Sequence, residues 1–332
     1  MSSDKNIKTV LLTPNRNGIE TAANFLKKRE LVSFPTETVY GLGASAYSNH
    51  AVAKIFSVKG RPTYNPLIVH IADPEDVKML ALIPNIASKL IKFFWPGPLT
   101  LVLPKIEKET QLSSLVTGNL NTVAIRCPSH PLARALIKKL GEPIAAPSAN
   151  ISGKISPTRA KDVLNNLDGR ISSIINGDRC TIGLESTIIG FEDELPILLR
   201  PGGIPLELIE EKLGMPLKTS KTQLTNQKKV LAPGMLKSHY SPDATLKLNV
   251  RNPQIGELFL GFGTMPNHCI GLCLSQNSDL SEAASNLFAS LTDLDLMAKL
   301  MTIKTIAVAP IPKLDLGLAI NDRLKRAAAP KY

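Results

Sequence analysis

The stretch SFPTETVYGLG, residues Ser33 to Gly43, follows a short apolar run and contains two threonines, a glutamate, a tyrosine and two glycines. Because ligands of open α/β sheets bind where strands end, the hydroxyl groups and the carboxylate of this stretch are suited to contact a polar ligand. Gly41 and Gly43 would let the main chain approach that ligand closely. The stretch therefore predicts an open α/β sheet with a binding site at a strand end.

The letters GLGASA, which overlap this stretch, match the G-x-G-x-x-A pattern of dinucleotide-binding proteins. That pattern requires a tight turn that opens directly into a helix. Here six residues separate the pattern from the preceding apolar run, and the next helical pattern begins only near Asn49. The context therefore argues against a dinucleotide-dependent oxidoreductase.

The composition is typical of a packed protein of two domains: 332 residues, 43% of them hydrophobic and 20% charged. The formal net charge of +11 is compatible with an anionic partner such as a nucleotide or RNA. No long basic run or Arg-Gly repeat occurs in the sequence, which argues against a dedicated nucleic-acid arm. Without a signal-peptide pattern or the roughly 18 consecutive apolar residues of a membrane span, we expect a cytoplasmic protein.

The four cysteines are Cys127, Cys180, Cys269 and Cys273. A zinc site would need four ligands with short, paired spacings. The first two cysteines are isolated, and the last two fall within a predicted strand. We therefore expect reduced, buried thiols and no metal site formed by side chains.

The first two thirds of the chain alternate short apolar runs with helical patterns. Hairpin-like strands and crossovers together indicate an α/β fold of the α+β-like kind, a twisted mixed open sheet with flanking helices. We expect strands at residues 9–13, 31–34, 67–71, 99–104, 122–128, 143–149, 172–176, 186–191 and 196–201. We expect helices at residues 19–28, 50–58, 130–140, 156–169 and 206–213.

Residues 216–237 contain five lysines and no acidic residue, and a Pro-Gly pair near their end favours a linker. Beyond them a second, smaller alternation of strands and helices indicates a Rossmann-like accessory domain. We therefore divide the chain into a first domain at residues 1–213, a linker at 214–242 and an accessory domain at 243–332. In the accessory domain we expect strands at residues 244–250, 257–262, 269–275 and 305–311 and helices at 281–291 and 316–328.

Cationic side chains accompany two of the predicted strands. Lys59 and Arg61 lie two residues apart in a short loop bounded by proline, where they are placed to bind one polyphosphate. A solvated helix C-terminus would explain them equally well. Strand alternation places Arg126 on the same face as Thr122, and a buried arginine needs a partner, a role that a ligand carboxylate would fill.

Hydroxyl groups accompany further strand ends. Ser148 and Ser156 lie in the segment AAPSANISGKISPT, which resembles an anion-binding turn, although Ser156 is also a good helix N-cap. The segments GLESTII and LLRPGG bring Ser186 and Arg200 to other strand ends. His70, in an apolar strand, is either a ligand contact or a satisfied core histidine.

In combination these stretches resemble one family, the threonylcarbamoyl-AMP synthases, which are built on a YrdC-type domain. The segments that carry the resemblance extend from Ser33 to Ile204 and are FPTETVYGLG, KGRPTYNPLIVHI, WPGPLTLVLP, VAIRCPSHP, IAAPSANISGKISPT, GLESTII and LLRPGGI. APGMLKSHYSP, followed by a domain that ends in LGLAINDRLKRAA, is similar to the long, two-domain branch of the family.

The resemblance implies an L-threonylcarbamoyladenylate synthase, a nucleotidyltransferase. Such an enzyme condenses L-threonine, bicarbonate or CO₂, and ATP, and it releases pyrophosphate. This reaction is the first step of threonylcarbamoyladenosine modification of tRNA next to the anticodon. The resemblance also implies Mg²⁺ bound with ATP and a downstream complex that transfers the threonylcarbamoyl group, and it leaves weak RNA binding open.

The family motifs also imply the site residues. Threonine would contact Thr38, His70, Arg126, Ala146 and Ser186. ATP would contact Lys59, Arg61, Asn65, Thr122, Ser148, Ser156, Arg200 and Tyr240. Lys59 and Arg61 would be the electrostatic catalysts, because N-carboxythreonine attacks phosphorus directly and the reaction needs positioning more than an enzyme nucleophile. The linker would close over the nucleotide as a lid, with Tyr240 against it.

Two alternatives remain open. An RNA-binding module without catalysis would explain the basic charge. A carbamoyl-transfer enzyme of the hydrogenase-maturation type also contains a YrdC-like module, but zinc-finger and acylphosphatase-like segments are absent from the sequence.

Overall fold

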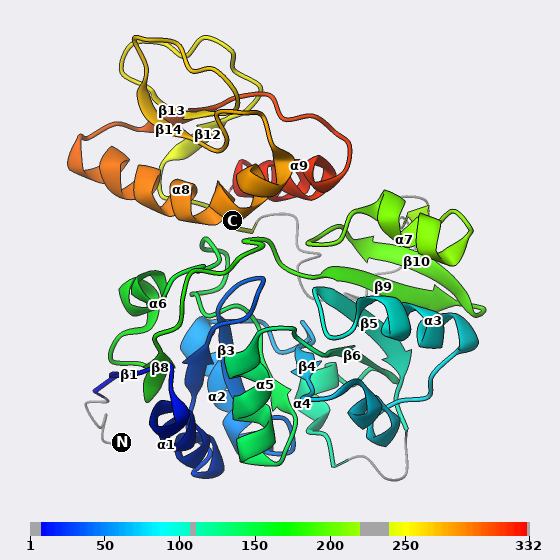
Figure 1. The fold of residues 1–332 in the computed structure, drawn as a ribbon. Coiled ribbons are helices and arrows are strands. Elements are labelled where there is room, and N and C mark those ends of the chain that lie inside the picture. The colour runs from blue at the N-terminus through cyan, green and yellow to red at the C-terminus, as the bar shows by residue number, and fades with distance from the viewer. Residues whose placement is uncertain (1–7, 107–110, 220–238, 331–332) are drawn as a thin grey trace.

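The computed structural model describes residues 8–106, 111–219 and 239–330. Most of the expected linker, residues 220–238, lies outside these ranges. The described chain forms a large domain with a broad sheet and, above it, a smaller domain in which β12–β14 lie beyond α8 and α9 (Figure 1). This arrangement confirms the predicted fold class.

The large domain is built on eleven described strands in the spatial order β1-β8-β2-β3-β7-β4-β6-β5-β9-β10-β11. The sheet is mixed, because it contains parallel pairs, such as β4 with β6, and antiparallel pairs, such as β5 with β6. The strands are β1 (Val10–Leu12), β2 (Val32–Phe34), β3 (Gly41–Ser45), β4 (Ile68–His70), β5 (Leu99–Pro104), β6 (Thr122–Arg126), β7 (Ile144–Ala145), β8 (Ser173–Ile175), β9 (Thr187–Glu192), β10 (Leu195–Arg200) and β11 (Lys218–Thr219).

Helices cover both faces of this sheet. The helices α1 and α5 pack together over one face, where they bury Phe34 and Ile144, whereas α2, α3 and α6 cover the opposite face and bury Leu42. The helices of the domain are α1 (Arg16–Lys27), α2 (Asn49–Lys59), the 3₁₀ helix η1 (Pro74–Met79), α3 (Asn85–Phe94), α4 (Ser114–Thr117), α5 (Pro131–Leu140), α6 (Ala160–Leu167) and α7 (Leu206–Leu213).

Strand β3 was not expected. The glycines of GLGAS form a central strand that pairs antiparallel with β2, so the Thr-Glu-Thr segment connects two neighbouring strands. Glycine is depleted in strands, which is why the pattern resembled a loop. At this position the glycines are needed, because a Cβ on Gly43 would lie 2.8 Å from the Phe34 ring and 2.9 Å from Ile144 Cγ2.

Helix α6 begins later than expected. Arg159 is its N-cap and Ala160 its first residue, so Ser156 does not cap a helix. The side chain of Ser156 instead donates a hydrogen bond to Glu185 Oε1 at 2.6 Å. The expected linker also starts later than residue 214, since β11 pairs with β10 and extends the large sheet.

The smaller domain has four described strands in the order β12-β15-β13-β14, all of them parallel. It matches the expected accessory domain, although its first helix is longer than predicted. The elements are β12 (Thr245–Lys247), β13 (Leu258–Gly261), β14 (Ile270–Cys273), α8 (Leu280–Leu300), β15 (Thr305–Val308) and α9 (Leu316–Ala327).

The two domains share an apolar core. Val39 and Leu184 of the large domain belong to the same buried cluster as Phe288 of α8. Tyr240, which precedes the smaller domain, belongs to this cluster as well. Gly183 has a φ of +70°, and a Cβ there would lie 2.5 Å from the carbonyl oxygen of Ser285 in α8. The smaller domain therefore packs directly against loops of the large one.

Gly43→Ala tests the packing of β3. Overpacking of this kind typically costs about 1 to 3 kcal/mol, so we expect the variant to have a lower free energy of unfolding in urea, followed by circular dichroism. Ala53→Val adds methyl groups at an exposed position of α2, and its effect should stay within about 0.5 kcal/mol. Equal stability of Gly43→Ala and the wild type would contradict the close approach of Phe34 and Ile144.

Candidate active site

A cavity lies on the face of the sheet that β4 and β6 share, beside the region covered by α1 and α5. The space in it that no atom fills, including space open to solvent, is about 540 Å³. The lining residues are Thr36, Thr38, Val39, Gly41, Arg61, Ile68, His70, Arg126, Ala146, Pro147, Ser148, Glu185, Ser186, Arg200, His239 and Tyr240. Nine of these are residues that the sequence predicted for the site.

Arg126 is fixed at one side of the cavity by three partners. The guanidinium forms an ion pair with Glu37 at 2.7 Å and donates hydrogen bonds to Thr38 Oγ1 at 2.7 Å and to the Gly97 carbonyl at 3.2 Å. Burial alone would raise the pKa of Glu37, but the charge and hydrogen bond of Arg126 lower it. The predicted need for a partner is thus met by a protein carboxylate, and a ligand would be an additional partner.

His70 lies next to Arg126, because the two residues are register partners on β4 and β6. Burial, helped by the positive charge of Arg126, lowers the pKa of His70 to about 3. Its Nδ1 is 3.2 Å from the carbonyl oxygen of Ile68. A neutral imidazole with Nδ1 facing an oxygen must carry its proton on Nδ1, so His70 is a neutral part of the wall.

Lys59 is not a lining residue, which departs from the expectation that it contacts phosphates directly. Its ammonium group is buried and donates to the carbonyl oxygens of Ser148, at 2.7 Å, and Asn150. Burial lowers the pKa of Lys59, and the neighbouring Arg61 charge adds to this effect. In this structure Lys59 therefore holds the turn that presents Ser148 to the cavity.

Arg61 also lines the cavity. Its Nη2 donates to Asn65 Oδ1 at 2.7 Å and to the Pro66 carbonyl at 2.8 Å, so Asn65 orients Arg61 and does not line the cavity. Burial lowers the pKa of Arg61 to about 10, with the charge of Arg200 acting in the same direction. A bound anion would compensate this desolvated charge.

Arg200 and Ser186 form the third part of the wall. Arg200 Nη2 donates to the Ser186 carbonyl at 2.8 Å and to its Oγ at 3.2 Å, and Ser186 Oγ is 2.7 Å from Thr100 Oγ1. Burial lowers the pKa of Arg200 to about 10. Ser156 is not a lining residue, but it donates a hydrogen bond to the lining residue Glu185. Thr122 begins strand β6 four residues before Arg126 and lies outside the lining.

Tyr240 and His239, near the end of the expected linker, also line the cavity. The Tyr240 ring is 1% exposed and is stacked on Phe288 of α8 at a centroid distance of 5.3 Å. The φ of Tyr240 is +66°, a conformation that non-glycine residues rarely adopt. The lid stays a prediction, because most of the expected linker lies outside the described residues. His239 stands in the same HYSP motif but was not among the predicted site residues.

The described residues contain no group of three or more His, Cys, Asp or Glu side chains that could hold a metal ion. All four cysteines are free thiols. Cys127 and Cys180 are buried, whereas Cys269 and Cys273 are half-buried. No helix among the described residues is long and apolar enough to cross a membrane.

Comparisons with known proteins cover nearly the whole chain. A family model described as "Telomere recombination" matches residues 24–202, and a model of the threonylcarbamoyl-AMP synthase C-terminal domain matches residues 204–329. The threonylcarbamoyl-AMP synthase of Bacillus subtilis is 42% identical over 334 residues, covering 96% of this chain and 94% of the relative. That of Pyrococcus abyssi is 43% identical, covering 93% and 94%. The chain belongs to the threonylcarbamoyl-AMP synthase family.

A solved structure supports this assignment. The crystal structure of P. abyssi Sua5 complexed with L-threonine superposes with a TM-score of 0.86 at 40% identity, covering 96% of this chain and 97% of that chain. E. coli YciO, at 22% identity and a TM-score of 0.53, shares the fold of the large domain. The resemblance predicted from the motifs is therefore confirmed, and the chain is an enzyme with the two-domain architecture.

A double-mutant cycle tests the pair of Arg126 and Glu37. Removing one partner of a buried ion pair typically costs about 3 to 5 kcal/mol, because the other charge stays buried. We expect Arg126→Gln to be destabilised by this amount in urea unfolding, and Glu37→Gln/Arg126→Gln to be destabilised clearly less. Additive effects of the two single substitutions would contradict the pairing.

The lowered pKa of His70 predicts a pH dependence. The unfolded chain binds a proton at this residue below about pH 6.5, whereas the folded chain binds it only near pH 3. Stability is therefore lost as the pH falls below about 6.5, by up to about 1.4 kcal/mol per pH unit. We expect a shallower loss in His70→Asn and no titration of the His70 NMR resonances between pH 5 and 8. A His70 resonance that titrates near pH 6.5 would contradict the buried, neutral imidazole.

Proposed function

We propose that this enzyme condenses L-threonine, bicarbonate or CO₂, and ATP to L-threonylcarbamoyladenylate and pyrophosphate. The observation that carries the proposal is that one cavity is lined by three arginines. Arg126 is placed to bind a carboxylate, and Arg61 and Arg200 are placed to bind phosphates. Such a cavity suits an amino acid next to a nucleotide. This reaction makes the enzyme a nucleotidyltransferase.

Threonine is assigned to the side of Arg126. The guanidinium is already oriented by Glu37 and Thr38, so it can bind a ligand carboxylate with little loss of conformational entropy. Ala146 and His70 supply a small apolar wall and a neutral polar group. The related P. abyssi protein was solved with L-threonine, which supports this choice of substrate.

ATP is assigned to the side of Arg61, Arg200 and Ser148. The lowered pKa values of both arginines reflect cations that lack full solvation, and phosphate oxygens are the ligands that best compensate such groups. Tyr240 would lie against the nucleotide. Lys59 holds Ser148 in place and Asn65 holds Arg61 in place. Thr122 and Ser156 are the remaining residues that we propose for ATP binding.

Mg²⁺ would arrive as part of the Mg²⁺–ATP substrate. Mg²⁺ usually binds substrate phosphates together with one or two carboxylates. Glu185 lines the cavity and Glu37 pairs with the lining residue Arg126, and both carboxylates are engaged by arginines. We therefore assign the coordination of Mg²⁺ mainly to the phosphates.

The reaction needs no enzyme nucleophile. The threonine amine adds to the carbon of CO₂ and loses one proton to solvent, and an oxygen of the new N-carboxylate group attacks the α-phosphorus of ATP. The bond from the α-phosphorus to the bridging oxygen then breaks, and pyrophosphate leaves. The protein aligns the two reactants and stabilises the charge on the phosphates, chiefly through Arg61 and Arg200.

The product is a mixed anhydride, which an acceptor nucleophile would consume. We propose that a downstream complex transfers the threonylcarbamoyl group to tRNA next to the anticodon. We therefore propose that the enzyme works in the cytoplasm, where ATP and tRNA both occur.

A product assay tests the function. Purified enzyme with Mg²⁺–ATP, L-threonine and labelled bicarbonate should form a labelled adenylate and pyrophosphate only when threonine is present. Arg61→Gln should lower kcat by about 100- to 1,000-fold, the usual effect of removing one preorganised donor. Arg134→Gln, which removes a half-buried arginine paired with Asp73 outside the cavity, should leave kcat unchanged. If the protein binds RNA in a salt-sensitive way and forms no adenylate, the result would support a non-catalytic RNA-binding protein instead.

A further inference from the structure

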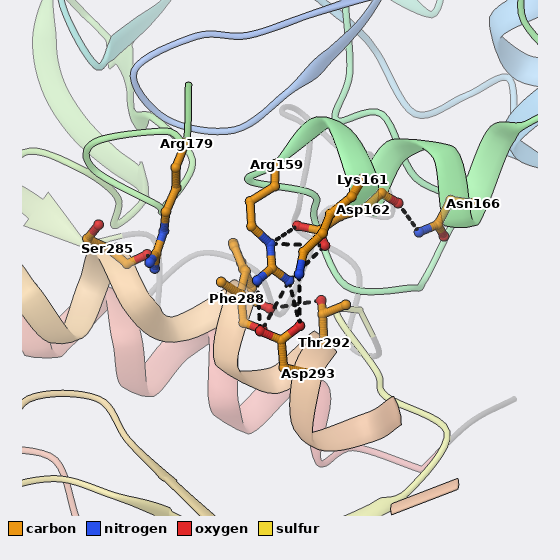
Figure 2. A network of polar contacts seen from close by, with 10 residues as sticks. Arg159, Lys161, Asp162, Asn166, Arg179, Ser285, Phe288, Thr292 and Asp293 are labelled. Carbon is orange, nitrogen blue, oxygen red and sulfur yellow. Dashed lines mark hydrogen bonds and ion pairs between the residues drawn. The ribbon is translucent and has the colours of Figure 1, made fainter. Parts of the chain in front are cut away.

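Arginines connect the two domains at an outer and an inner position. At the outer position, Arg159 at the start of α6 donates to Asp162 at 2.8 Å and to Asp293 of α8 at 2.7 Å, and Figure 2 shows this fork between the domains. The Asp293 side chain is 39% exposed. This contact joins the domain surfaces and lies outside the cavity lining.

The inner position is Arg323 of α9, which is fully buried. Its Nε donates to Glu185 Oε2 at 2.7 Å, and its Nη1 donates to Asp322 Oδ2 at 2.7 Å. Its Cζ lies 5.4 Å from the centre of the Tyr240 ring, within the range of a cation–π interaction. One side chain of the smaller domain therefore contacts two lining residues of the cavity.

Glu185 is the residue on which this contact acts. Its carboxylate lies at a cavity that also contains Arg61 and Arg200, and its other oxygen accepts a hydrogen bond from Ser156. Burial would raise the pKa of Glu185, but the charges of Arg323 and Arg200 lower it to about 2, so the carboxylate is ionised. An ionised carboxylate competes with phosphates for the same cations, unless another cation neutralises it.

We propose that Arg323 is a positioning residue through which the smaller domain neutralises Glu185 and supports the Tyr240 ring, so that the cavity accepts the phosphates of ATP. The inference rests on the proposed function, because it assigns this side of the cavity to ATP. It distinguishes Arg323 from Arg159, which joins the same two domains without contact to a lining residue.

The test compares variants of the full chain. We expect Arg323→Gln to raise the KM for ATP by roughly 5- to 150-fold, the usual range of coupling between two sites, and to change the KM for threonine by less than about threefold. In Glu185→Gln/Arg323→Gln most of the ATP affinity should return, because no unpaired carboxylate remains. Arg159→Gln is the matched control and should lower Tm while leaving the KM for ATP unchanged.

Calorimetric titration with the non-hydrolysable analogue AMPCPP gives a readout that does not depend on turnover. Arg323→Lys keeps the positive charge and should fold even where Arg323→Gln does not, with an affinity between those of Arg323→Gln and the wild type. If the wild type neither binds AMPCPP nor forms the adenylate, the proposed function fails. If the wild type does both, and the Arg323 variants bind AMPCPP as tightly as Arg159→Gln, the positioning role of Arg323 is overturned.

Discussion

Four guanidinium groups are buried around one cavity, and the cost of removing such charges from water constrains the rest of the structure. Arg126 and Arg323 are compensated by the carboxylates Glu37 and Glu185. Arg61 and Arg200 are held by main-chain and side-chain oxygens, and burial lowers their pKa values. Arg61, Arg126 and Arg200 all line the cavity, which is why we propose that it accepts the carboxylate of an amino acid together with the phosphates of a nucleotide.

The same constraint explains why the smaller domain is part of the site. Glu185 belongs to the large domain, but its partner Arg323 comes from α9, so this ion pair forms only when the two domains are packed together. Tyr240 lies between them, against Phe288 and under the Arg323 side chain. The accessory domain thus contributes to the chemistry of the site as well as to the shared apolar core.

Much of the site could be predicted from the sequence, because motifs at strand ends carry local information. Arg61, Arg126 and Arg200 are near one another in the structure, as those motifs indicated. Contacts between distant residues could not be predicted: the partner of Arg126 is 89 residues away at Glu37, and that of Glu185 is 138 residues away at Arg323, on a helix with an ordinary amphipathic pattern. Ser156 was misinterpreted as a helix cap because a serine before a proline is a strong local signal, whereas its actual partner, Glu185, is distant in the sequence.

The most direct test of the central claim is a crystal structure of the enzyme with L-threonine and AMPCPP bound together. The account predicts that both ligands occupy this cavity, with the threonine carboxylate within hydrogen-bond distance of Arg126 and the phosphates within hydrogen-bond distance of Arg61 and Arg200. A nucleotide bound elsewhere, or phosphates placed at Arg126, would contradict the division of the cavity by its buried charges.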